Sequence, residues 1–151
     1  MNTKLVAFLL LALAMSWPAI ASASDEAAEN DAEEVAEESS EPLASGIGWQ
    51  LVRSVELGSS GKFVNMVLIE QGRQADKTIY SSALNRLCRD EKDFCRVRFW
   101  MQERFIPEKA SMTTEQNRHL LADHLFNREA GIHRIEYACS VDPTNDECIA
   151  H

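Results

Sequence analysis

Residues 88–100 read Cys-Arg-Asp-Glu-Lys-Asp-Phe-Cys-Arg-Val-Arg-Phe-Trp, and this stretch decides the predicted fold. Two cysteines enclose a charged turn, and apolar and polar positions then alternate from Cys95 to Met101. Alternation with a period of two indicates a half-buried strand. The residues before Cys88 have helical spacing instead, so the stretch is predicted to reverse a helix into a strand.

Upstream of this stretch the sequence predicts a hairpin followed by a helix. Residues 49–57 alternate as a strand, 58–61 (Gly-Ser-Ser-Gly) form a turn, and 63–70 are apolar on both faces, which is typical of a central strand. Asp76 can cap a helix from Lys77 to about Cys88. Its apolar stripe comprises Ile79, Tyr80, Ala83, Leu84 and Leu87.

Downstream, the spacing of Thr113 and Gln116 matches a capping box and predicts a second helix that ends near Gly131. Its inward stripe would be Leu120, Leu121, His124, Leu125 and Phe126. Residues 132–139 predict a fourth strand. The expected fold is therefore α+β with the order β-β-α-β-α-β: a four-stranded sheet with two helices on one face, stapled by disulfides.

The four cysteines, Cys88, Cys95, Cys139 and Cys148, allow three pairings. We favour Cys88–Cys95 and Cys139–Cys148, since each would close a short loop. The alternative joins Cys139 to Cys88 or Cys95. Neither a Cys-x-x-Cys motif nor a common zinc-ligand spacing occurs, so we expect no thioredoxin-like chemistry, metal or cofactor.

The N-terminus has the features of an export signal. Lys4 precedes an apolar run over 5–15, and Ala21-Ser22-Ala23 fits a signal peptidase site. We predict a signal peptide over 1–23, periplasmic or secreted localisation in a bacterium, and no stable membrane insertion after cleavage. The alternative is an uncleaved membrane anchor.

Residues 24–42 hold nine acidic residues and no base, and Val35 is their only large apolar side chain. We predict a disordered acidic linker here and a single domain over 43–151. That domain holds 15 acidic and 14 basic residues. Because it lacks a basic excess, the sequence argues against a general nucleic-acid-binding surface.

The polar side of the third predicted strand is the candidate binding surface. Arg96, Arg98 and Trp100 point to one side, and arginine and tryptophan concentrate binding energy at interfaces. They could grip an anionic ligand or an acidic partner. The structural alternative pairs the two arginines across strands with Glu136 or Glu56.

No catalytic motif is visible, so the sequence predicts a protein that is not an enzyme. Its expected role is a non-enzymatic exported interaction module, an inhibitor or envelope accessory protein that binds a protein partner in the cell envelope. The alternative is a periplasmic small-ligand binder or hydrolase with a cleft near His124 or His133. For His124, a partly buried structural role competes with a role as a base.

A core of the form Cys-x6-Cys-x-Val-x-Phe-Trp resembles that of small exported bacterial domains of unknown function. The resemblance covers about residues 78–139. It rests on Cys88, Phe94, Cys95, Val97, Phe99, Trp100, Pro107, Met112, Thr113, Gln116, Asn127 and Gly131. It implies export, disulfide formation and an α+β fold, and it carries over no catalytic residue.

Overall fold

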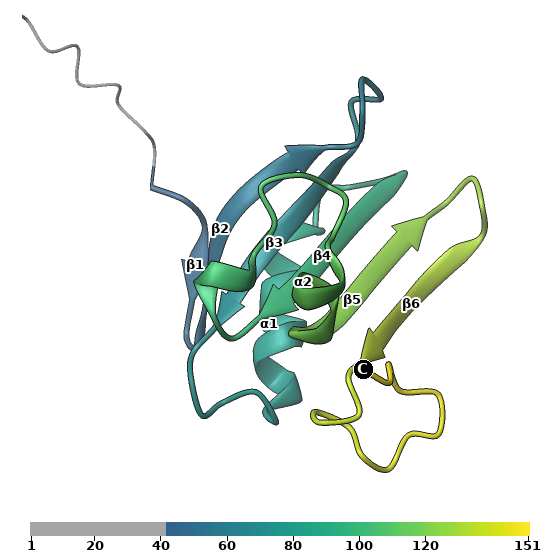
Figure 1. Cartoon of the computed structure of the whole chain (residues 1–151). Coiled ribbons are helices and arrows are strands. Elements are labelled where there is room, and N and C mark those ends of the chain that lie inside the picture. The colour runs from purple at the N-terminus through teal and green to yellow at the C-terminus, as the bar shows by residue number, and fades with distance from the viewer. Residues whose placement is uncertain (1–41) are drawn as a thin grey trace, which may run out of the picture. The chain divides into compact units, whose positions relative to one another are not determined.

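The computed structural model describes residues 42–151. Six strands occur in this part of the chain: β1 (Ser45–Gly46), β2 (Trp49–Glu56), β3 (Phe63–Ile69), β4 (Phe94–Trp100), β5 (Leu120–Asn127) and β6 (Ile132–Tyr137). The helices are α1 (Lys77–Leu87), the short 3-10 helix η1 (Glu103–Phe105) and α2 (Thr114–Arg118). Figure 1 shows the strands side by side in one sheet.

The strands lie in the sheet in chain order, from β1 to β6. All neighbouring pairs are antiparallel except β3 and β4, which run parallel. Parallel neighbours need a crossover connection, and α1 supplies it. The sheet therefore consists of two antiparallel meanders, β1–β3 and β4–β6, that meet at one parallel seam.

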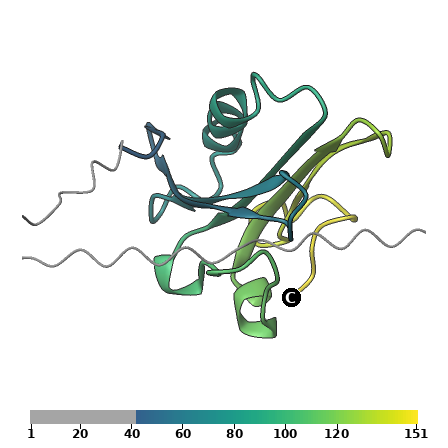
Figure 2. The same cartoon turned by 90° about the horizontal axis from the view of Figure 1, so that it is seen from above.

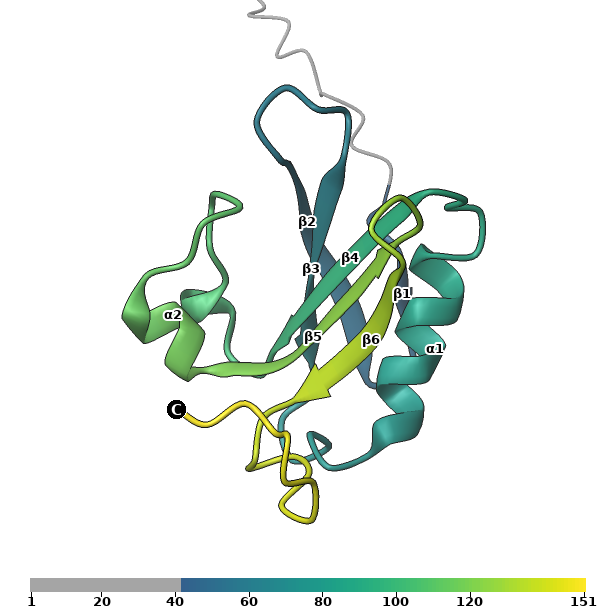
Figure 3. The same cartoon turned by 90° about the vertical axis from the view of Figure 1, so that its right-hand side faces the viewer.

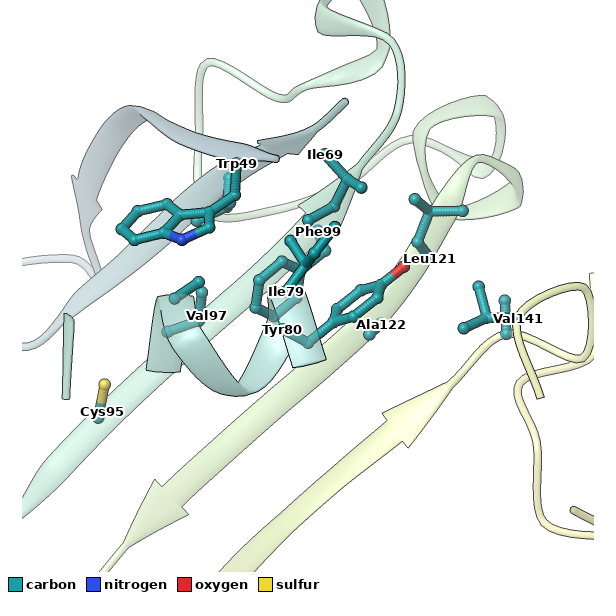
Figure 4. Packing of buried hydrophobic residues seen from close by; sticks show 13 residues of the cluster. Trp49, Ile69, Ile79, Tyr80, Cys95, Val97, Phe99, Leu121, Ala122 and Val141 are labelled. Carbon is teal, nitrogen blue, oxygen red and sulfur yellow. The ribbon is translucent and has the colours of Figure 1, made fainter. Parts of the chain in front are cut away.

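Helix α1 covers one face of the sheet (Figure 2). Asp76 caps the helix, because its side chain accepts a hydrogen bond from the backbone N–H of Thr78. Ile79, Tyr80 and Ala83 are buried against the strands. Figure 4 shows this packing, with Tyr80 between α1 and the strands. The buried members of this core include Trp49, Val67, Ile69, Val97, Phe99, Leu121 and Ala122.

The opposite face carries a second core beneath the segment 101–119, which contains η1 and α2. Figure 3 shows α1 and α2 on opposite sides of the sheet. The buried members of this core are Val64, Met66, Trp100, Ile106 and Leu120. Both sheet faces are thus covered, which explains why β3 and β4 carry buried apolar side chains in both directions.

The α+β class is confirmed, but the expected four-stranded sheet with two helices on one face is wrong. The sheet is mixed and has six strands, and the helices lie on opposite faces. The second helix has the predicted capping box between Thr113 and Gln116, yet it ends at Arg118. The apolar residues after it form β5, which pairs with β4 on one side and β6 on the other. Gly131 has a positive φ of 65°, but it lies in the β5–β6 turn.

The preferred cysteine pairing is confirmed. Cys88 bonds to Cys95, between the end of α1 and the start of β4. Cys139 bonds to Cys148, which closes the C-terminal loop. That loop returns to the sheet, where Ile149 forms an isolated bridge with Ala138. Two disulfides favour an oxidising compartment outside the cytoplasm.

The predicted signal peptide lies outside the described residues, as does the predicted acidic linker apart from Pro42. Within residues 42–151, no helix is long and apolar enough to cross a membrane.

Candidate functional site

Trp100, one of the three predicted binding residues, lies inside the protein. Its exposed fraction is 0%, and its indole N–H donates to the backbone oxygen of Gln116 at 3.0 Å. The side chain therefore anchors α2 to the end of β4, and it is not available to a partner.

Arg98 is also buried, with 9% of its side chain exposed. Its Nε donates to Asp123 Oδ2 at 3.1 Å, and its Nη1 donates to the backbone oxygen of Ala110 at 2.8 Å. Burial lowers the pKa of Arg98 from its ordinary value, and the Asp123 carboxylate opposes this shift. Arg98 thus holds the loop before α2 onto the sheet.

Arg96 shares the same carboxylate. Its Nε and Nη2 donate to the two oxygens of Asp123 at 3.1 and 2.7 Å, in a bidentate arrangement. About 27% of its side chain is exposed. Neither expected acidic partner pairs with these arginines: Glu136 pairs with Arg134, and Glu56 accepts from the backbone of Gly61. Of the three predicted binding residues, only Arg96 keeps substantial exposure.

The histidines do not converge on a cleft. His124 is buried on the α1 face of β5, and its Nδ1 has no hydrogen-bond partner in the structure. Desolvation lowers the pKa of His124, the neighbouring His133 adds to the shift, and the backbone of Arg134 and the carboxylate of Asp123 oppose it. The two rings meet edge-on with centroids 5.7 Å apart. His124 therefore has the environment of a structural histidine.

No group of three or more metal-ligating side chains occurs within residues 42–151. His119 stacks on Phe105 with ring centroids 3.6 Å apart, and its Nε2 lies 3.3 Å from a Glu115 oxygen. Both rings line a small hollow of about 170 Å³ beside Ser140. In the described part of the chain, the charged partner of His119 is therefore Glu115, and Ser140 lines the same hollow.

A larger hollow of about 460 Å³ lies where the β2–β3 hairpin meets the disulfide-closed turn before β4. It is lined by Ser54, Gly61, Lys62, Phe63, Asn65, Glu91, Asp93, Phe94 and Cys95. Phe63 is 47% exposed, one of three large apolar side chains in the described residues with such exposure. The hollow therefore combines an accessible aromatic side chain with polar groups.

Comparison with protein-family models, curated proteins and solved structures found no match.

The polar groups of this hollow are arranged around the two phenylalanines. Ser54 Oγ donates to Asn65 Oδ1 at 2.6 Å, which leaves the amide N–H groups of Asn65 able to donate to a ligand. The ammonium group of Lys62 lies 5.5 Å from the centroid of the Phe94 ring. With two carboxylates and one ammonium group, the lining has an excess of one negative charge. It can accommodate an apolar side chain next to a basic one.

Sequence reasoning missed this hollow because its residues come from three segments that are distant in the chain. Phe63 belongs to an apolar run over 63–70, and such a run indicates a central strand without showing which of its side chains is exposed. One signal was present, since Phe63 begins the strand just after a glycine turn, where a strand emerges from the core.

Proposed function

We propose that the protein is a non-enzymatic binding module of the bacterial cell envelope, secreted or periplasmic, which binds a protein partner at the hollow around Phe63. The exposed aromatic ring at the rim of a 460 Å³ hollow is the observation that carries the proposal. Exposed aromatic residues next to a pocket are typical anchors of protein interfaces.

The hollow is held in shape by covalent and paired elements. The Cys88–Cys95 disulfide fixes the turn that supplies Glu91 and Asp93. The β2–β3 pairing places Phe63 opposite Glu56 at the end of the hairpin. A preorganised surface loses less conformational entropy on binding, so a small contact area can suffice.

The charge of the hollow indicates the chemistry of the partner. Glu91 and Asp93 line it, and Lys62 is the only base among the lining residues. We therefore expect the partner to present an apolar side chain flanked by lysine or arginine, since complementary charge favours association and specificity.

Site-specific photo-crosslinking tests the proposal. A photoreactive phenylalanine replaces Phe63, which pairs with Glu56 at the end of β2. In a matched protein it replaces Ile47, which is 83% exposed and lies just before the start of β2. In envelope extract we expect one main adduct from position 63 and none from position 47. The charge-reversed variant Glu91→Lys/Asp93→Lys should lose that adduct. Identical adducts from both positions, or an adduct insensitive to charge reversal, would contradict the proposal.

The alternative function, a small-ligand binder or hydrolase with a histidine cleft, has less support. His124 is buried in packing, and neither His124 nor His133 lines the hollow around Phe63 or the small hollow beside Ser140.

A further inference from the structure

The outward side of α1 carries basic and uncharged polar residues only. The helix contains neither Asp nor Glu, while its inward side chains Ile79, Tyr80 and Ala83 are buried. The outward residues line an open hollow of about 590 Å³. These are Lys77, Thr78, Ser81, Ser82, Asn85, Arg86 and Arg89. No carboxylate belongs to this lining.

Four of these residues form one stripe along the helix. Ser82 is three positions before Asn85 and four before Arg86, and Arg89 follows these two by four and three positions, which are the spacings of neighbours on a helix surface. Arg89 lies in the turn after the C-cap residue Cys88, and it lines the same hollow as Arg86. Both guanidinium groups can reach one anion.

The four residues of the stripe are exposed and carry hydrogen-bond donors. The indole N–H of Trp49 donates to Ser82 Oγ at 3.3 Å, so the hydroxyl hydrogen of Ser82 is left to donate elsewhere. The side chains of Asn85, Arg86 and Arg89 form no hydrogen bond or ion pair with another residue in the described part of the chain. Lys77 differs, because its Nζ lies 2.6 Å from Asp142.

Two effects oppose an anion at this place, and both are smaller than the attraction. The C-terminal end of a helix carries about −0.5 of an elementary charge, against two full positive charges on Arg86 and Arg89. Asp90 and Glu91 follow in sequence, but neither lines the hollow. The arginines therefore dominate the local field.

From this geometry we propose that the outer stripe of α1 is an anion-binding site for a phosphate group. Arg86 and Arg89 would form the ion pairs, and Ser82 and Asn85 would donate hydrogen bonds. The planar fork of arginine matches phosphate oxygens, and a phosphate group with a charge of about −1.5 to −2 balances two arginines more fully than a carboxylate with a single charge. This site shares no lining residue with the hollow around Phe63 and does not depend on the function proposed for it.

Amide NMR of the exported protein with added inorganic phosphate tests the site, with sodium chloride at matched ionic strength as the reference. We expect saturable shift changes at Ser82, Asn85, Arg86 and Arg89. The double variant Arg86→Gln/Arg89→Gln should weaken binding at least tenfold. The matched control is Arg118→Gln on α2, where Arg118 pairs with Glu115 at 3.2 Å, and this variant should bind like the wild type.

A second arm distinguishes the sources of the phosphate. Vesicles containing phosphatidylglycerol are compared with vesicles of phosphatidylcholine alone. Saturable binding of inorganic phosphate assigns the site to soluble phosphates, and arginine-dependent binding to the anionic vesicles alone assigns it to lipid headgroups. The proposal is overturned if neither probe binds above its reference, or if the double variant binds as well as the wild type. Unchanged near-ultraviolet circular dichroism verifies that the variant is folded.

Discussion

Arg98 on β4 and Asp123 on β5 form a buried ion pair, with 3.1 Å between Arg98 Nε and Asp123 Oδ2. The two residues are also partners in the β4–β5 ladder. Because Arg96 binds the same carboxylate, one acidic side chain compensates two arginines. We expect Asp123→Asn to lower the free energy of unfolding by about 3–5 kcal/mol, since it leaves a buried charge without its partner. Urea denaturation measures this difference.

Glu115→Gln is the matched control. It removes the carboxylate from an ion pair whose side chains are more than half exposed, so the expected cost is below about 1 kcal/mol. Equal costs for the two substitutions would show that the Asp123 pair is effectively solvated.

Trp100→Phe should loosen α2. The substitution removes the indole donor to Gln116 and leaves a backbone oxygen without its partner, at a cost of about 1–3 kcal/mol. Hydrogen exchange should accelerate at the amides of α2, while the amides of α1 stay protected. Trp49→Phe is the comparison, because its indole donates to Ser82 on α1 instead. Unchanged exchange in α2 after Trp100→Phe would be inconsistent with an anchoring role.

Replacing both Cys139 and Cys148 by serine should destabilise the protein by about 2–3 kcal/mol, from the loop-closure entropy of a short loop. The disulfide keeps the C-terminal segment in place, where Ile149 N–H donates to the backbone oxygen of Tyr137. We expect exchange to accelerate more at the amides of residues 139 and 149 than at the amides of β3, because the loop loses its local restraint in addition to the global stability. Uniform acceleration across the sheet would instead mean that the loop is part of the global folding unit.

His124 should make stability fall as pH decreases from about 7 to 5. Desolvation lowers its pKa in the folded protein, so the unfolded chain binds the proton first as pH falls through about 6.5. The free energy of unfolding therefore decreases with pH until the lower pKa of His124 in the folded protein is reached. His124→Gln removes this titration. Urea denaturation at pH 7.5 and 5.5 should show a smaller stability difference for His124→Gln than for the wild type, and equal differences would rule out His124 as the cause.

The first half of the fold follows from its sequence because local signals and tertiary contacts agree there. Alternation at 49–57, the glycine turn and the cap at Asp76 predict β2, β3 and α1 within a residue or two. β1 was missed, since a strand of two residues leaves no periodic signal.

In the second half of the domain, the sequence wrongly predicts a helix where β5 lies, because apolar residues lie on both sides of β5. A strand buried on both faces has no alternation, and its pattern can match a helix stripe. This segment forms a strand because it pairs with both β4 and β6, and the pairing with β4 places Asp123 next to Arg96 and Arg98. Arg96 and Arg98, two positions apart on one side of the strand, were a usable signal, because a buried arginine requires a carboxylate nearby.

The predicted binding surface shows the same limit of local patterns. Arg98 and Trp100 are buried because residues 101–119 fold over their side of β4, where Ala110 and Gln116 accept hydrogen bonds from them, and no local pattern predicts this contact. The hollow around Phe63 depends on three distant segments meeting, which no local pattern encodes.

The parallel seam between β3 and β4 has a consequence for the order of assembly. Val64 pairs with Arg96, 32 positions further along the chain, whereas the hairpins on either side close through short turns. Closing a long loop costs more entropy, so distant pairs form later than local ones. During synthesis, the meander β1–β3 is therefore expected to form before β4–β6 has been synthesised. The edge of β3 then stays exposed until β4 pairs with it. The Cys88–Cys95 crosslink, which joins residues only seven apart, can form before that edge is covered.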